Sequence, residues 1–140
     1  MKFRNVEQRD MAMKQIEVVA AIIRREGLYF ATQRGYGEFE GMWESPGGKI
    51  EPGEEPEGAL VREIREELDV EVTVEELFCV REFEYPRFRL KLHCYFCSLA
   101  GSDEPRLLEH KSGCWLPACE LGRLKWLPAD EEIIDRLSQG

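Results

Sequence analysis

Acidic side chains are concentrated in one stretch of the sequence, residues 51–67. This stretch holds seven of the 28 acidic residues and only two basic ones, a local net charge of −5. At about 100° per residue along a helix, Glu63, Glu66 and Glu67 fall within an arc of about 100°. Like charges at this spacing destabilise a helix by roughly 0.2–0.5 kcal/mol per pair. Because Mg²⁺ and Mn²⁺ prefer carboxylate and phosphate oxygens, this face predicts a divalent metal site.

A solvated acidic face with Arg62 and Arg65 as ion-pair partners is the alternative interpretation. The preceding turn, Pro46-Gly47-Gly48-Lys49, favours the metal site. Two glycines let the backbone approach a ligand closely, and Lys49 adds a cation suited to phosphate. A glycine turn followed closely by a carboxylate helix therefore indicates metal-assisted phosphate chemistry.

The carboxylates need a helix to hold them, and the sequence predicts one over residues 56–68. Proline suits the first helical position, and an apolar stripe runs beside the acids, formed by Leu60, Val61, Ile64 and Leu68. A second helix is predicted over residues 129–137, and a long loop over 35–53. A hairpin is predicted from two strands, one at residues 16–23 and one in the following segment LYFATQR. Further strands are predicted at 70–74, 77–84, 87–99 and 113–116. This order predicts one α/β domain with helices on the faces of a sheet.

Charge and composition narrow the possible partners. The chain has 140 residues and a formal net charge of −9, which disfavours polymeric nucleic acid and anionic membrane surfaces. A small polyanion can still bind if cations accompany it. No apolar run approaches the roughly 18 residues of a membrane span, and the first residues lack the apolar centre of a secretory signal. We therefore expect a cytoplasmic protein without a membrane partner.

Cysteine usage and the N-terminus complete this outline. The five cysteines form an odd set, which favours reduced thiols. Cys94 and Cys97 lie three apart in a strand-like run, so they should point to opposite faces, and core packing is favoured over zinc. Residues 1–14 are polar and are predicted to be a flexible extension before a single domain at 15–140.

Residues 48–70, GKIEPGEEPEGALVREIREELDV, resemble the signature of the Nudix hydrolases, G-x5-E-x7-R-E-U-x-E-E-x-G-U, where U is a bulky aliphatic residue. Eight signature positions match in register: Gly48, Glu54, Arg62, Glu63, Ile64, Glu66, Glu67 and Val70. Asp69 replaces the last signature glycine. Glycine there follows the helix in a left-handed conformation, which Asp tolerates better than most residues. We expect Asp69 to reduce stability and leave the metal ligands unchanged.

The resemblance, which extends more loosely to MutT-type members, implies an α/β/α sandwich with a mixed sheet. It implies hydrolysis of a nucleoside diphosphate linked to another group. It also implies that one to three Mg²⁺ ions, or Mn²⁺ as a substitute, are coordinated by the Gly47 carbonyl, Glu63, Glu66 and Glu67. Arg62 would orient a glutamate by a charge-assisted hydrogen bond.

The general base and the phosphate contacts are further expectations from the resemblance. Glu63 or Glu109 would accept the proton of the attacking water. Glu109 lies six residues before Trp115, where MutT-type proteins have another metal-linked glutamate; an ordinary loop acid is the alternative. Arg34 stands at the end of the second strand, where relatives often have a phosphate-binding arginine; a surface strand end is the alternative. His110 is interpreted as a surface histidine.

Asp130 is the candidate for contacts with the base, because Trp126-Leu127-Pro128-Ala129-Asp130 resembles the stretch where relatives contact it. An ionised Asp130 could accept from an amino group such as cytosine N4, and a protonated one could donate to a carbonyl. A cap for the last helix is the alternative. Ser45 stands where many MutT-type proteins have an aromatic residue, which weakens the case for oxidised guanine. Three loop aromatics could stack on a base or pack on the core: Tyr36, Phe39 and Trp43.

Three functions are therefore compared. The first is a Mg²⁺-dependent pyrophosphohydrolase that converts (deoxy)nucleoside triphosphates to the monophosphate and pyrophosphate, with oxidised or methylated nucleotides as candidate substrates. The second is a hydrolase of nucleotide sugars or dinucleoside polyphosphates. The third is a nucleotide-binding regulator without catalysis. The acidic signature positions are all present, which favours an enzyme.

Overall fold

The computed structural model describes residues 14–139 and begins with the predicted hairpin. Strand β1 (Lys14–Arg25) turns into β2 (Leu28–Gln33) through a two-residue loop, Glu26-Gly27, whose φ angles are 53° and 82°. Arg25 pairs with Leu28 in an antiparallel register. Two central residues with positive φ match the right-handed twist of the flanking strands, which suits a tight hairpin.

A seven-stranded mixed sheet forms the centre of the molecule. Its path is β3 (Trp43–Glu44), β2, β1, β6 (Phe88–Leu99) and β5 (Val72–Glu84). In addition, β4 (Gly47–Lys49) pairs with β1, and β7 (Ser112–Pro117) pairs with β2. β1 runs parallel to β6, and β5 lies antiparallel to β6 at one edge. β7 is antiparallel to β2. The sheet therefore joins strands from both halves of the chain.

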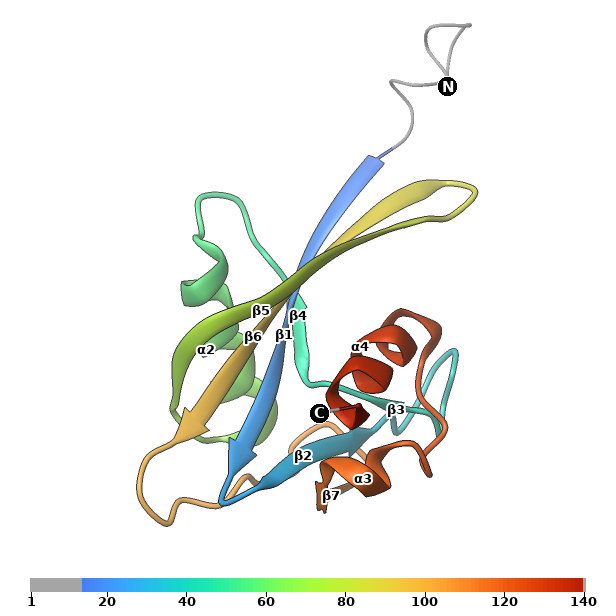
Figure 1. The fold of residues 1–140 in the computed structure, drawn as a ribbon. Coiled ribbons are helices and arrows are strands. Elements are labelled where there is room, and N and C mark those ends of the chain that lie inside the picture. Colours follow the sequence, from blue (N-terminus) through green and yellow to red (C-terminus); the bar gives the residue numbers. More distant parts are fainter. Residues whose placement is uncertain (1–13, 140) are drawn as a thin grey trace, which may run out of the picture.

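Helices cover both faces of this sheet (Figure 1). Alternate residues of β1 serve the two sides: Val19, Ala21 and Ile23 pack with α2 (Pro56–Leu68), whereas Ala20 and Ile22 pack with α4 (Pro128–Ser138). This alternation is the period of two expected for a strand buried on both faces. The predicted α/β/α sandwich with a mixed sheet is confirmed.

Three local features differ from the sequence predictions. The predicted loop at 35–53 contains two short strands, β3 (Trp43–Glu44) and β4 (Gly47–Lys49). The predicted strands at 70–74 and 77–84 form one strand, β5, with register shifts between Val74 and Cys79. A short helix, α3 (Ala118–Leu121), follows β7. β3 and β4 have no alternating pattern of their own, because pairing with distant strands creates them.

The helix α2 has the predicted bounds and ends as expected. Pro56 occupies its first turn, and Asp69 follows its last residue in the left-handed region, with φ 55° and ψ 40°. The Asp69 N–H donates to the Arg65 carbonyl at 3.1 Å. Aspartate therefore takes the conformation that the signature glycine would take.

The remaining predictions concern the cysteines and the N-terminus. All five cysteines are free thiols, and Cys94 and Cys97 belong to the cores on opposite faces of the sheet, as expected. The predicted extension at 1–14 lies outside the described residues except for Lys14, which begins β1. Within residues 14–139, no helix is long and apolar enough to cross a membrane.

Candidate active site

The carboxylate face of α2 lies beside the buried stripe of the same helix. Leu60, Ile64 and Leu68 are fully buried, and this stripe draws the neighbouring acids inward. The side chains of Glu63 and Glu67 are 15% and 11% exposed, whereas that of Glu66 is 55% exposed. Two carboxylates are therefore held in a largely water-excluded place, and the third faces solvent.

Arg62 ties the helix to the loop that precedes it. Its guanidinium donates to Glu54 at 2.7 and 2.9 Å, to Glu63 at 3.0 Å and to the Lys49 carbonyl at 3.0 Å. The hydrogen bond from Arg62 lowers the pKa of Glu54 to about 2. Arg62 thus orients Glu63 and holds the glycine turn against α2 in one network.

The two glycines of the turn lie close to other parts of the fold, Gly48 to α2 and Gly47 to β1. A Cβ on Gly48 would lie 2.4 Å from the Glu63 carboxyl group. A Cβ on Gly47 would lie 1.9 Å from the Val19 carbonyl oxygen of β1. A side chain at Gly47 would therefore collide with the backbone of β1, whereas one at Gly48 would displace the Glu63 carboxyl group. Gly47 also lines a pocket.

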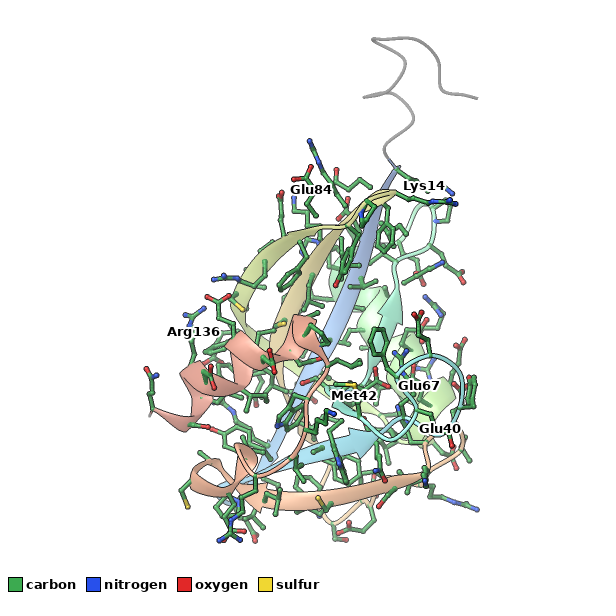
Figure 2. The ribbon with its side chains drawn as sticks, turned by 90° about the vertical axis from the view of Figure 1, so that its right-hand side faces the viewer. Lys14, Glu40, Met42, Glu67, Glu84 and Arg136 are labelled. Carbon is green, nitrogen blue, oxygen red and sulfur yellow. The ribbon has the colours of Figure 1, made fainter. Side chains whose placement is uncertain are left out.

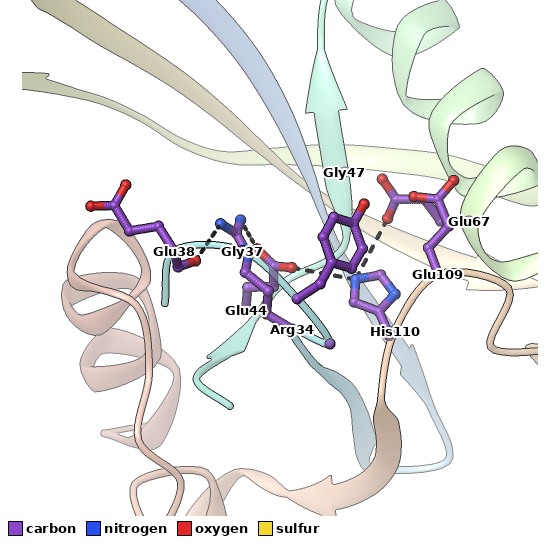
Figure 3. Close-up of a pocket in the computed structure, with 10 residues that line it drawn as sticks. Arg34, Gly37, Glu38, Glu44, Gly47, Glu67, Glu109 and His110 are labelled. Atoms are coloured by element: carbon purple, nitrogen blue, oxygen red, sulfur yellow. Dashed lines mark hydrogen bonds and ion pairs between the residues drawn. The ribbon is translucent and has the colours of Figure 1, made fainter. Parts of the chain in front are cut away.

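This pocket, of about 310 Å³, gathers several of the predicted residues (Figure 3). Arg34 comes from the end of β2, Gly47 from β4, Glu67 from α2, and Glu109 from the segment before β7. The loop that follows Arg34 covers one side, and Figure 2 shows it, marked by Glu40 and Met42, at the same end of the molecule as Glu67. Residues distant in sequence thus line one pocket that is rich in acidic side chains.

The charged form of Glu67 is disfavoured in the pocket. Its Oε1 is buried and has no hydrogen-bond partner among the described residues. Burial, then the adjacent carboxyl of Glu63 and the charges of Glu109 and Glu44, raise the pKa of Glu67 to about 9. A carboxyl in this position gains most from a cation that binds its free oxygen.

The donor set fits a hard divalent cation. Glu63, Glu66, Glu67 and the Gly47 carbonyl offer only oxygen, and Glu67 Oε1 is an orphaned buried acceptor. Within residues 14–139, no group of three or more His, Cys, Asp or Glu side chains is already arranged around one point for a metal ion. Glu63 bonds Arg62 and Glu66 points to solvent, so these two side chains would turn to complete a site.

Two pocket residues were missed or misjudged from the sequence. Glu44 accepts a hydrogen bond from Arg34 at 2.8 Å, and its other oxygen lies 3.3 Å from His110 Nε2. Burial would raise the pKa of Glu44, but hydrogen bonds from His110 and Arg34 outweigh it and lower that pKa. His110 is buried, with its side chain 7% exposed, so the interpretation as a surface histidine is wrong. The polar run EHKSG gives no local signal of burial.

Lys49 does not join the pocket. Its side chain is exposed on β4, and only its carbonyl takes part in the Arg62 network. Tyr36 and Phe39 are 67% and 45% exposed, whereas Trp43 packs against the core under α4. Among the loop aromatics, the two exposed ones are thus free to meet a ligand.

Asp130 lies at the start of α4, deeply buried behind the glycine turn. Its carboxylate accepts a hydrogen bond from the Ser45 N–H at 3.2 Å, and burial raises the pKa of Asp130 to about 7. The helix is preceded by Leu127 and has no side-chain cap, so the capping alternative is not what the structure shows. Ser45 lies two residues before Gly47, so one short segment links Asp130 to the pocket.

Comparisons with known proteins agree with this fold. A model of the NUDIX domain matches residues 13–137. The chain is 38% identical to a CTP pyrophosphohydrolase of Escherichia coli, over 88% of this chain and 91% of that one. It is also 38% identical to an 8-oxo-dGTP diphosphatase of Haemophilus influenzae, over 91% and 94%.

The solution structure of the E. coli ORF135 protein superposes with a TM-score of 0.78 at 36% identity, covering 89% of each chain. Sequence and fold thus agree over nearly the whole length of the described residues. The chain belongs to the Nudix family of hydrolases.

Proposed function

We propose that this Nudix hydrolase is a Mg²⁺-dependent pyrophosphohydrolase that converts (deoxy)nucleoside triphosphates to the monophosphate and pyrophosphate. The observation that carries the proposal is the buried, unpartnered Glu67 oxygen in a pocket shared with Arg34 and the Gly47 turn. With Glu67 and Arg34 in one pocket, a polyphosphate could meet a metal ion at Glu67 and the guanidinium of Arg34. The two relatives, named for hydrolysis of CTP and 8-oxo-dGTP, support a triphosphate substrate.

The metal would be held by the Gly47 carbonyl, Glu63, Glu66 and Glu67. Members of the Nudix family generally need a divalent metal, and an all-oxygen set favours Mg²⁺, with Mn²⁺ as a substitute. A divalent cation there supplies positive charge to phosphate oxygens and lowers the pKa of water. Arg62 would keep Glu63 and the glycine turn in place for this role through its hydrogen bonds to the Glu63 carboxylate and the Lys49 carbonyl.

Other side chains would bind phosphate and move the proton. Arg34 would contact phosphate from the pocket wall, and Lys49 would add a more distant, exposed cation. Glu63 and Glu109 are the two candidates for the general base. Glu63 bonds Arg62, whereas Glu109 has no ion-pair partner within residues 14–139. The pH–rate profiles of Glu63→Gln and Glu109→Gln distinguish them, because only loss of the general base removes the acidic limb of the profile.

Asp130 would contact the base. An ionised carboxylate accepts from an exocyclic amino group, and a protonated one also donates to a carbonyl. A pKa of about 7 makes both forms available near neutral pH. Normal, oxidised and methylated bases are therefore all substrate candidates, and removal of damaged nucleotides from the cytoplasmic pool is the proposed role. The net charge of −9 favours a small nucleotide over a nucleic-acid polymer.

A nucleotide panel with product analysis tests the proposal. With Mg²⁺, we expect pyrophosphate and monophosphate from at least one triphosphate, and a fall of more than about 100-fold in kcat/KM for Glu66→Gln and Glu67→Gln. Glu57→Gln is the matched control, because Glu57 is exposed on the same helix away from the pocket. Release of a sugar phosphate from a nucleotide sugar, or cleavage of a dinucleoside polyphosphate alone, would favour the second function. Nucleotide binding without turnover would favour a regulator.

A further inference from the structure

His110 lines the pocket but is neither a metal ligand nor a phosphate contact in the proposed function. It follows Glu109 in the segment before β7, and its side chain is 7% exposed. Figure 3 shows its ring between the carboxylates of Glu44 and Glu67. The ring therefore fills the space where two acidic side chains from different elements would otherwise meet.

One ring nitrogen faces both carboxylates. His110 Nε2 lies 3.3 Å from Glu44 Oε2 and 3.8 Å from Glu67 Oε1, whereas the buried Nδ1 has no partner within residues 14–139. Glu44 is ionised, since it pairs with the Arg34 guanidinium at 2.8 Å, and an ionised carboxylate only accepts hydrogen bonds, so the nitrogen that faces Glu44 must carry the hydrogen. Nε2 is thus the donor, and Glu44 is the nearer acceptor.

The contacts continue beyond Glu44. Its second oxygen accepts from Arg34 at 2.8 Å, so Arg34, Glu44, His110 and Glu67 form a continuous series across the pocket. Glu44 is held from both sides, and Glu67 is left with one oxygen turned toward the pocket and no firm hydrogen bond. The phosphate-binding side and the metal-binding side are joined through a single imidazole.

We propose that His110 is a positioning residue: its Nε2–H keeps Glu44 on Arg34, and its ring separates Glu44 from Glu67, so that Glu67 Oε1 is left free for the metal. The proposal rests on the proposed function, since it assumes that Glu67 binds metal and Arg34 binds phosphate. Orienting groups behind metal ligands affect affinity by roughly 10- to 100-fold. A role in packing alone would depend on the shape of the ring and not on its donor.

Two polar substitutions separate these roles. The amide nitrogen of His110→Gln can reach the place of Nε2, whereas that of His110→Asn reaches only the place of Nδ1. Electron paramagnetic resonance of the free ion measures the affinity for Mn²⁺. We expect this affinity to be within about threefold of wild type for His110→Gln and at least about tenfold weaker for His110→Asn. The KM for the triphosphate should rise in His110→Asn with the loss in metal affinity, because Arg34 loses its fixed partner.

The second histidine provides a matched control. His93 Nε2 lies 2.9 Å from Glu17, its side chain is 13% exposed, and it does not line the pocket. His93→Asn should leave Mn²⁺ affinity and KM unchanged, and thermal unfolding of every variant reports on folding. Equal Mn²⁺ affinity in His110→Asn and His110→Gln, whether both are weak or both are like wild type, would overturn the proposal. A wild-type protein that binds no Mn²⁺ and cleaves no nucleotide would instead overturn the proposed function itself.

Discussion

Asp130 shows how burial sets the chemistry of a single residue. A carboxyl that accepts one backbone hydrogen bond in an otherwise closed site is disfavoured in its charged form, so its pKa rises to about 7 from an ordinary value near 3.8. The stability that comes from burying the neutral acid is complete below about pH 4 and is lost as the pH rises through about 7. The same property leaves Asp130 able to accept or donate near neutral pH.

Asp130→Asn should remove this pH dependence. At about 1.4 kcal/mol per pH unit, the free energy of unfolding of wild type should fall relative to the variant by about 2–3 kcal/mol between pH 5 and pH 8. Denaturant unfolding at several pH values measures the difference. Asp135→Asn, at an exposed position of the same helix, should show a constant difference. A constant difference for Asp130→Asn as well would mean that Asp130 is ionised throughout.

At the scale of elements, the glycine turn and α2 act as one unit. Gly48 faces the end of a flexible side chain, Glu63, whereas Gly47 faces the backbone of β1. An added methyl group should therefore disturb the site at Gly48 and the fold at Gly47. This distinction follows from what each Cβ would meet.

Gly48→Ala should reduce kcat/KM by about 100-fold, because a carboxylate displaced by about 1 Å no longer holds its geometry. Its unfolding free energy should change little, since Glu63 can swing away.

Gly47→Ala should destabilise the protein strongly by breaking the pairing of β4 with β1. Gly58→Ala is the control: Gly58 lies in α2 with open space around it, and alanine should add about 0.5–1 kcal/mol of stability without a change in rate. Full activity in a folded Gly48→Ala variant would show that Glu63 need not keep its place.

Asp69 ends α2 in a conformation that glycine adopts at no steric cost. Its ion pair with Arg106, at 3.6 Å between exposed side chains, contributes little. Asp69→Gly should therefore raise the unfolding free energy by up to about 1 kcal/mol, and Asp69→Ala should lower it by about 1 kcal/mol. Both variants should keep the wild-type rate, because no pocket residue is touched. If alanine were as stable as glycine here, the left-handed conformation would not be the reason for the difference.

At the scale of the whole molecule, the two sets of proposed ligand contacts lie on opposite faces of one sheet. α2 carries the carboxylates on one side, and α4 presents Asp130 on the other (Figure 1). The segment from Trp43 to Gly47 passes between them, bonding Asp130 through Ser45 and lining the pocket through Gly47. A stretch of five residues thus links the Asp130 carboxylate to the pocket, and in the proposed function this stretch would set the distance between the base and the polyphosphate.

Local patterns predicted the parts of this arrangement that depend on neighbours in the sequence. The bounds of α2 follow from Pro56 and from the stripe of Leu60, Ile64 and Leu68, and the carboxylate face follows from the same spacing. β3, β4 and the burial of His110 depend on strands and loops distant in the chain, so no local period marks them. Glu44 lies within the predicted loop, and only its pairing with Arg34 and His110 reveals its place in the pocket.

The proposed function requires that the acidic face of α2 and the Gly47 turn bind a divalent metal. Anomalous diffraction from crystals soaked in MnCl₂ and a non-hydrolysable triphosphate tests it most directly. We expect a manganese peak within about 2.5 Å of a Glu67 oxygen, with Glu63, Glu66 or the Gly47 carbonyl as further ligands. A well-ordered nucleotide in the pocket with no manganese at any of these oxygens would contradict it.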